Sequence, residues 1–105
     1  MQALNNHVNW VSTQGVEGVR LKWVAKDFTD LDLSEYGSLR YATFIGCNLS
    51  GLNAEGLDLR YATFISCDMS DANLNRCDLR GVTFTACNIE TMSYDYARVE
   101  GLVIR

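Results

Sequence analysis

The chain has 105 residues, with 13 acidic and 9 basic side chains and a formal net charge of −4. This length allows a single domain, and 48% hydrophobic with 21% charged residues is typical of a folded globular chain. The acidic balance gives no electrostatic reason to bind nucleic acid or an anionic membrane, since both attract an excess of Lys and Arg. We therefore expect no direct nucleic-acid contact, whereas a basic partner stays possible.

No apolar run approaches the roughly 20 residues that a helix needs to cross a bilayer. The N-terminal sequence also lacks the basic start and apolar stretch of a signal peptide. The sequence thus predicts no membrane association and a cytoplasmic location. In that compartment the four cysteines, Cys47, Cys67, Cys77 and Cys87, are expected to be reduced thiols rather than a disulfide framework.

Residues 1–18 are predicted to form a capping helix and the segment that leads into the rest of the domain. Leu4, Val8 and Val11 fall at positions i, i+4 and i+7 of one helical face, and Gly15 lies where a helix commonly ends. A short amphipathic helix there would cover the first layer of a repeat stack, because an open end exposes strand edges and core side chains.

Residues 39–98 consist of three successive 20-residue units. The first, 39–58, is identical to the second, 59–78, at 11 of 20 positions, and the third, 79–98, matches the second at 5. A finer period of five is present throughout, because a large apolar residue recurs at every fifth position, apart from the small Ala54. The members of this series are Leu39, Phe44, Leu49, Leu59, Phe64, Met69, Leu74, Leu79, Phe84, Ile89, Tyr94, Val99 and Ile104.

A period of five excludes the common regular structures. A helix turns by about 100° per residue, so this series would spread around all of its sides. A flat strand has period two and would send successive members to opposite faces. The pattern is satisfied when each five-residue unit is a short extended segment that ends in a corner, so that four units close one square coil. Equivalent positions would then stack at about the 4.7–4.9 Å spacing of paired strands.

The units resemble those of the pentapeptide repeat family, whose loose motif is A(D/N)LXX. The triplets ATF, CNL, CDM, ANL, CDL, VTF and CNI stand in its first three positions. The resemblance implies an all-β solenoid, a right-handed quadrilateral β-helix of about four coils over residues 19–105, which follows the short capping α-helix. Leu33 and Leu39 are six residues apart, so we expect one inserted residue and a bulge at that corner. Lys26 and Arg98 depart from the motif in the first and last coils.

Two sets of side chains, each spaced by 20 residues, are predicted to stack inside the coils. The aromatic set is more typical of a core ladder than of a cofactor site. The cysteine set places thiols in a row, whereas tetrahedral zinc needs four converging ligands, so we interpret these cysteines as small buried hydrophobes and expect no metal and no cofactor. The predicted core ladders are Phe44, Phe64 and Phe84, and Cys47, Cys67 and Cys87.

An outward column is the candidate binding surface. Arg40, Arg60 and Arg80 each follow an inward Leu, and Tyr41 and Tyr61 lie beside them. A guanidinium ladder can bind carboxylate or phosphate groups, and Tyr can stack on a ligand. An Asp stands two positions before the second and the third Arg, so the column could instead be neutralised on a solvated face.

The final segment is apolar and carries no helix signal. Val99, Leu102, Val103 and Ile104 either complete a last partial coil or contact a second subunit. A homodimer through the C-terminal end is therefore one expectation.

No motif for catalysis is present: the sequence has no Gly-rich phosphate loop, no nucleophile elbow and no paired acid and base. We predict that the protein is not an enzyme but a rigid protein–protein interaction module of unknown partner.

The resemblance implies an alternative, because some pentapeptide repeat proteins mimic DNA and bind DNA gyrase, inhibiting it or protecting it from quinolones. Against this, residues 39–98 have a net charge of only −2, whereas duplex DNA over their expected length of about 14 Å carries about eight negative charges. A structural element of a phage or secretion assembly is the other alternative.

Overall fold

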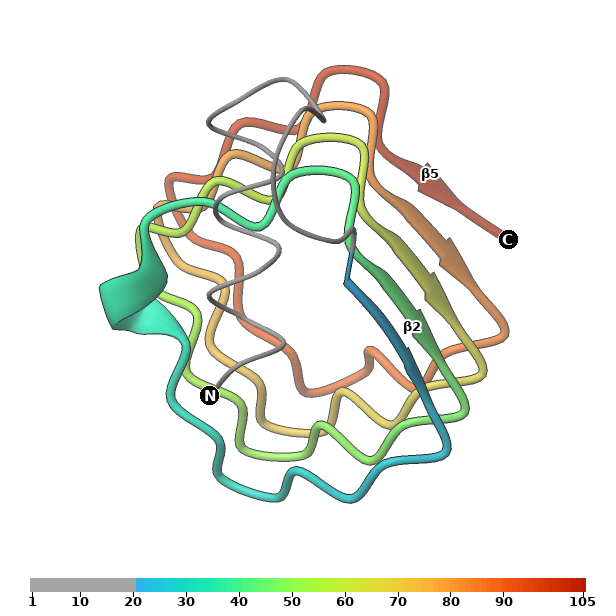
Figure 1. Cartoon of the computed structure of the whole chain (residues 1–105). Helices are drawn as coiled ribbons and strands as arrows, with labels where there is room; N and C mark the ends of the chain where they lie inside the picture. The colour runs from blue at the N-terminus through green and yellow to red at the C-terminus, as the bar shows by residue number, and fades with distance from the viewer. Residues whose placement is uncertain (1–20) are drawn as a thin grey trace.

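Residues 21–105, which the computed structural model describes, wind into a stack of four-sided coils (Figure 1). One side of each coil is a short strand, and the strands pair in parallel in the order β1-β2-β3-β4-β5. Their bounds are β1 Lys22–Val24, β2 Thr43–Ile45, β3 Thr63–Ile65, β4 Thr83–Thr85 and β5 Val103–Ile104. The predicted all-β solenoid is confirmed, whereas the predicted capping helix over residues 1–18 lies outside the described residues.

The other three sides are built from isolated parallel β-bridges between successive coils. We call the side that contains β1–β5 wall 1. Wall 2 contains the bridge of Asn48, wall 3 contains that of Asn53, and wall 4 contains that of Asp58. Backbone hydrogen bonds run along the stack on every wall; for example, the N–H of Leu49 donates to the carbonyl of Asp68 at 2.8 Å. These bonds fix each residue directly beneath its equivalent in the previous coil.

The corners require an unusual backbone conformation at almost every fifth residue. Residues two positions after an inward side chain have positive φ, from 54° at Ser66 to 76° at Gly101. On walls 2, 3 and 4 a turn closes around this residue, as where the N–H of Leu52 donates to the carbonyl of Leu49 at 3.1 Å. A positive φ at the third residue is the mark of a type II turn, which favours glycine, and Gly51 occupies that place.

One extra residue separates the first coil from the others. Asp32 pairs with Asn53, which is 21 residues later, but Ser38 pairs with Asp58, which is 20 residues later. Between these two bridges the chain forms a 3-10 helix, η1 Ser34–Tyr36, which projects from the first coil at the corner between walls 3 and 4 (Figure 1). The inserted residue expected at this corner is therefore present, and it is accommodated in a helical turn rather than in a strand bulge.

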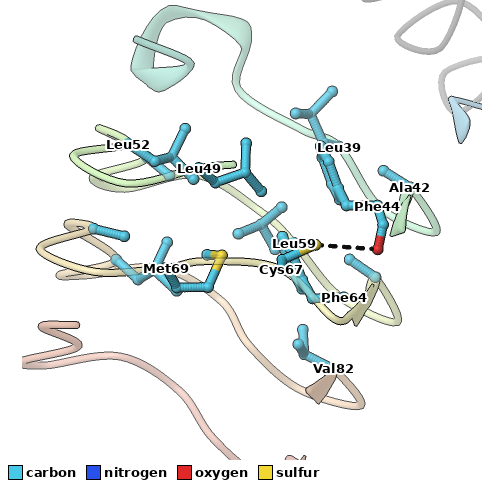
Figure 2. Packing of buried hydrophobic residues seen from close by; sticks show 14 of the residues in the cluster. Leu39, Ala42, Phe44, Leu49, Leu52, Leu59, Phe64, Cys67, Met69 and Val82 are labelled. Atoms are coloured by element: carbon cyan, nitrogen blue, oxygen red, sulfur yellow. Dashed lines mark hydrogen bonds between the residues drawn. The ribbon is translucent and has the colours of Figure 1, made fainter. Parts of the chain in front are cut away.

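The interior is filled by stacked apolar side chains that point inward from all four walls (Figure 2). Phe64 stacks on Phe44 and Phe84, with ring centroids 4.8 and 4.9 Å apart. Trp23 continues this column into the first coil, with its ring edge-on to Phe44 at 5.6 Å. Leu, Ala, Met and Cys side chains fill the other inward positions of the two middle coils and are buried.

The last coil leaves inward positions uncovered. Val103 and Ile104 form β5 and pair with β4, so this segment completes one side of a partial coil. Val99 and Ile104 occupy inward positions but are exposed, Leu102 is only partly buried, and Val103 is exposed at an outward position in register with Thr83. The stack within residues 21–105 thus ends in an apolar surface and in the free edge of β5.

Replacing Phe64 with Ala should destabilise the fold strongly, because the ring is buried and stacked on both faces. We expect a loss of about 3–5 kcal/mol in the free energy of unfolding. Tyr96, an exposed aromatic side chain that contacts Arg76, is the matched control, and Tyr96→Ala should lose less than about 1 kcal/mol. Urea unfolding followed by circular dichroism measures both, and equal losses would contradict the assigned core.

Candidate functional site

Wall 4 carries the predicted arginine column, and its charges are paired with one another. Arg60 forms a bidentate contact with Asp58, with Nη2 2.8 Å from Oδ2, and Arg80 does the same with Asp78 at 2.6 Å. Longer contacts of 3.6 Å connect neighbouring coils, from Arg40 to Asp58 and from Arg60 to Asp78. The arginine and aspartate side chains therefore form one continuous ladder in which the opposite charges are interleaved.

The pKa values on this wall follow from the ladder. The hydrogen bond from Arg80 holds the pKa of the Asp78 carboxyl below its ordinary value, and the charges of Arg80 and Arg60 act in the same direction. Asp58 raises the pKa of Arg60 in the same way. The charge of the column is therefore satisfied internally. The structure thus matches the solvated, neutralised face that the sequence left open, and a ligand-binding role for the column stays a prediction.

The tyrosines beside this column are also packed against their neighbours. The rings of Tyr41 and Tyr61 are stacked, with centroids 5.4 Å apart and planes 13° from parallel. The equivalent position in the next coil is Gly81, where an added Cβ would lie 2.4 Å from Cδ1 of Tyr61. Tyr61 therefore lies against the backbone of Gly81, and the aromatic stack ends there because Gly81 has no side chain.

Wall 2 carries an acidic surface that the sequence analysis did not single out. The exposed carboxylates on this wall, called the acidic wall below, are Asp27, Asp30, Asp68, Asp71 and Glu90. The segments 27–30, 48–51, 68–71 and 88–91 contain no basic residue, and the exposed Lys26 directly precedes the first of them. Within residues 21–105 none of the five carboxylates forms an ion pair. This wall therefore presents negative charge that is free to interact with solvent or with a partner.

The carboxylates of the acidic wall alternate with neutral side chains from coil to coil. Asp27, Asn48 and Asp68 follow one another in one bridge column, so no two carboxylates are directly stacked in it. Asp68 accepts hydrogen bonds from the backbone and the hydroxyl of Ser70, and these bonds lower the pKa of its carboxyl. The carboxylates thus stand at fixed, regular intervals, with the direct repulsion of stacked like charges avoided.

The cysteines show no arrangement for a metal. Cys47, Cys67 and Cys77 are buried, and Cys87 is only partly buried, because no further coil covers it within the described residues. Across residues 21–105 no group of three or more His, Cys, Asp or Glu side chains is placed to hold a metal ion. No helix in this part of the chain is both long and apolar enough to span a bilayer.

Four-sided coils, a five-residue unit and a parallel bridge ladder on each wall define a quadrilateral β-solenoid protein. The chain belongs to the pentapeptide repeat family, since residues 38–104 match the family model described as a pentapeptide repeat region. A search of curated proteins finds no match to the sequence.

Solved structures of pentapeptide repeat proteins resemble this one. A pentapeptide repeat protein from the thylakoid lumen of Arabidopsis thaliana is 28% identical, with a TM-score of 0.73 over 77% of this chain and 55% of that protein. Rfr23 from the cyanobacterium Cyanothece is 23% identical, with a TM-score of 0.40 over 82% of this chain and 58% of that protein. QnrB1, a plasmid-mediated fluoroquinolone resistance protein, is 19% identical, with a TM-score of 0.38 over 80% and 51%. This chain thus spans little more than half the length of these proteins.

Two glycines at equivalent kinds of corner give a direct test of the packing beside the arginine column. Gly81 and Gly56 have nearly the same φ, 72° and 74°, so replacing either with Ala imposes a similar backbone strain of about 1–2 kcal/mol. An added Cβ meets Tyr61 only at Gly81 and has open space at Gly56. Gly81→Ala should therefore destabilise the protein by at least about 1 kcal/mol more than Gly56→Ala.

Urea unfolding measures this difference, and the variant Tyr61→Ala supplies its control. Combining Tyr61→Ala with Gly81→Ala should remove the excess loss, because the conflicting ring is then absent. Equal losses for the two glycine variants would show that Tyr61 moves away freely, and the described stack would then not be a fixed feature of the surface.

Proposed function

We propose that this protein is a non-catalytic interaction module whose acidic wall binds a basic segment of a partner protein. The observation that carries the proposal is the contrast between two walls. On wall 4 the arginines and aspartates neutralise one another, whereas the five exposed carboxylates of wall 2 form no ion pair within residues 21–105, and Lys26 stands beside only the first of them. Such a surface attracts positively charged groups over about one Debye length, roughly 8–10 Å, and favours partners of complementary charge.

The rigidity of the solenoid supports a binding role. Hydrogen bonds between coils hold Asp68 and Asn88 in a fixed relation, and the stacked core beneath them leaves little room for the walls to move. A partner that binds a preformed surface avoids the entropic penalty of ordering flexible segments. The acidic wall is therefore pre-organised to present its carboxylates to a partner.

The test compares two double variants of equal charge. Asp68→Asn with Asp71→Asn removes two carboxylates from the acidic wall. Asn is tolerated at position 68, because Asn48 already makes the equivalent bond to Ser50. Asn is tolerated at position 71, because Asn adopts positive φ readily. Asp95→Asn with Glu100→Gln removes two exposed carboxylates from other walls. Immobilised wild-type protein should capture a partner that the first variant loses, at least about tenfold in affinity, and that the second retains.

The salt dependence of capture should agree with this comparison. Binding to the wild type should weaken as ionic strength rises, and the acidic-wall variant should show a smaller dependence. Retention of the partner by the acidic-wall variant, or equal loss in both variants, would contradict the assigned surface.

The gyrase alternative would use the same acidic wall, since a DNA mimic presents regularly spaced negative charge to a protein that binds duplex DNA. A supercoiling assay with purified gyrase, in the presence and absence of a quinolone, separates it from binding to other partners. Inhibition or protection that is lost in the Asp68→Asn, Asp71→Asn variant would favour the DNA mimic.

The phage or secretion alternative would be favoured by end-to-end filaments in electron micrographs. The cytoplasmic location also stays a prediction.

We propose, in addition, that two copies associate through the C-terminal end. This end exposes the free edge of β5 and the apolar side chains of Val99, Val103 and Ile104. Exposed strand edges and apolar patches are commonly covered by a second chain. A two-fold contact would pair β5 with its copy and bury these side chains.

Sedimentation at increasing protein concentration tests this association. The wild type should shift from monomer to dimer, and Ile104→Lys should stay monomeric because a buried charge would be unpaired in the interface. Val24→Lys is the matched control, since Val24 is a similarly exposed apolar residue of wall 1, at the opposite end of the sheet (51% exposed against 56%). A monomeric wild type, or equal dissociation of both variants, would overturn the proposal.

A further inference from the structure

The middle of wall 1 carries threonines that are aligned from coil to coil. Thr43, Thr63 and Thr83 begin β2, β3 and β4 and are paired with one another in the sheet (Figure 1). Each of them is followed by a Phe of the buried column, so its own side chain points outward. Threonine hydroxyl and methyl groups therefore recur along this wall at the strand spacing of about 4.7–4.9 Å.

The hydroxyl groups of these threonines are left to the solvent. Their side chains are only partly buried, and within residues 21–105 none of the three hydroxyls hydrogen-bonds to another group of the protein. The serines of wall 2 differ, since the hydroxyl of Ser50 donates to the side chain of Asn48 at 2.9 Å. A hydroxyl can both donate and accept hydrogen bonds, so the threonines of wall 1 bind water at the interval of the coils.

A second outward column completes this surface without adding charge to its centre. Ile45, Ile65 and Thr85 stand two residues after the threonines and are also only partly buried. Within the described part of wall 1 only Lys22 and Arg105 are charged, and they lie in its first and last coils. The central coils of wall 1 therefore present a regular array of methyl and hydroxyl groups that contains no ion.

The spacing of this array is close to that of water molecules in ice. Each water forms tetrahedral hydrogen bonds of about 2.7–2.8 Å, so two waters that share a neighbour are about 4.4–4.6 Å apart. The strand spacing differs from this repeat by only a few tenths of an ångström. Bonds between coils, such as that from the N–H of Thr63 to the carbonyl of Ala42 at 2.9 Å, hold the threonines at this spacing.

We propose that wall 1 is an ice-binding surface, whose ligand is crystalline water. The hydroxyls of Thr43, Thr63 and Thr83 take part in the first layer of water as donors and acceptors, and the methyl groups fill the spaces between the bound waters. The rigid wall presents this array before it meets the ice, so little ordering is required on binding. Ice can then grow only between the bound molecules, as curved fronts that melt at a lower temperature than a flat surface.

The test measures the freezing and melting temperatures of a single ice crystal in a solution of the folded protein. The wild type should hold the crystal without growth over an interval below its melting temperature and should give it facets. Thr63→Lys should abolish both effects, because a charge at the centre of the array orients water around itself. The fold tolerates this change, since Lys22 already occupies the equivalent place in β1, next to Thr43.

Thr91→Lys is the matched control, because it makes the same substitution at an exposed threonine of wall 2. This variant should retain the freezing interval and the facets of the wild type. Circular dichroism checks that both variants are folded.

Slow growth of ice from the solution gives a second readout. The wild type and Thr91→Lys should be enriched in the ice over the remaining liquid, and Thr63→Lys should stay in the liquid. A wild type that shows no freezing interval and is excluded from ice would overturn the proposal, as would equal behaviour of the two variants. Self-association that Thr63→Lys abolishes would also overturn it, because wall 1 would then be covered by a second copy.

Discussion

Hydrogen bonds between coils are the interaction on which the rest of this structure depends. They place every residue under its equivalent about 4.7–4.9 Å away. The side chains of equivalent residues must therefore be able to stack on one another. Phe on Phe satisfies this condition in the core, and Arg60 between Asp58 and Asp78 satisfies it on wall 4. The requirement for a backbone N–H on every wall also accounts for a sequence without proline.

The same constraint explains why the walls differ in chemistry. Direct stacking of like charges is unfavourable, so a wall can be charged only if the charges are paired or spaced. Wall 4 pairs them, and its surface is nearly neutral. The acidic wall spaces them, since Asn48 separates Asp27 from Asp68, and the charge is therefore not cancelled. The two walls thus meet the same packing condition in two ways, one by pairing its charges and the other by spacing them.

The period of five was sufficient to predict the solenoid, because it determines which side chains point inward. Adding 20 to a residue number then located the Phe and Arg columns. Adding 20 also aligns Asp68 with Asn48, but it misplaces Asp27 and Asp30, because the extra residue at η1 places Asp27 above Asn48 and not above Cys47. The interatomic distances that pair Arg80 with Asp78, and the partial exposure of Cys87, also required the three-dimensional structure.

The corner at η1 shows how a repeat of fixed length can change in length. Local bonds, such as that from the N–H of Tyr36 to the carbonyl of Leu33, replace the bonds between coils over this short stretch. The bridges on either side, at Asp32 and Ser38, keep their partners in the next coil. Additional residues at this corner would therefore extend away from the stack, and a solenoid of this kind can acquire a loop during evolution without shifting the alignment of its layers.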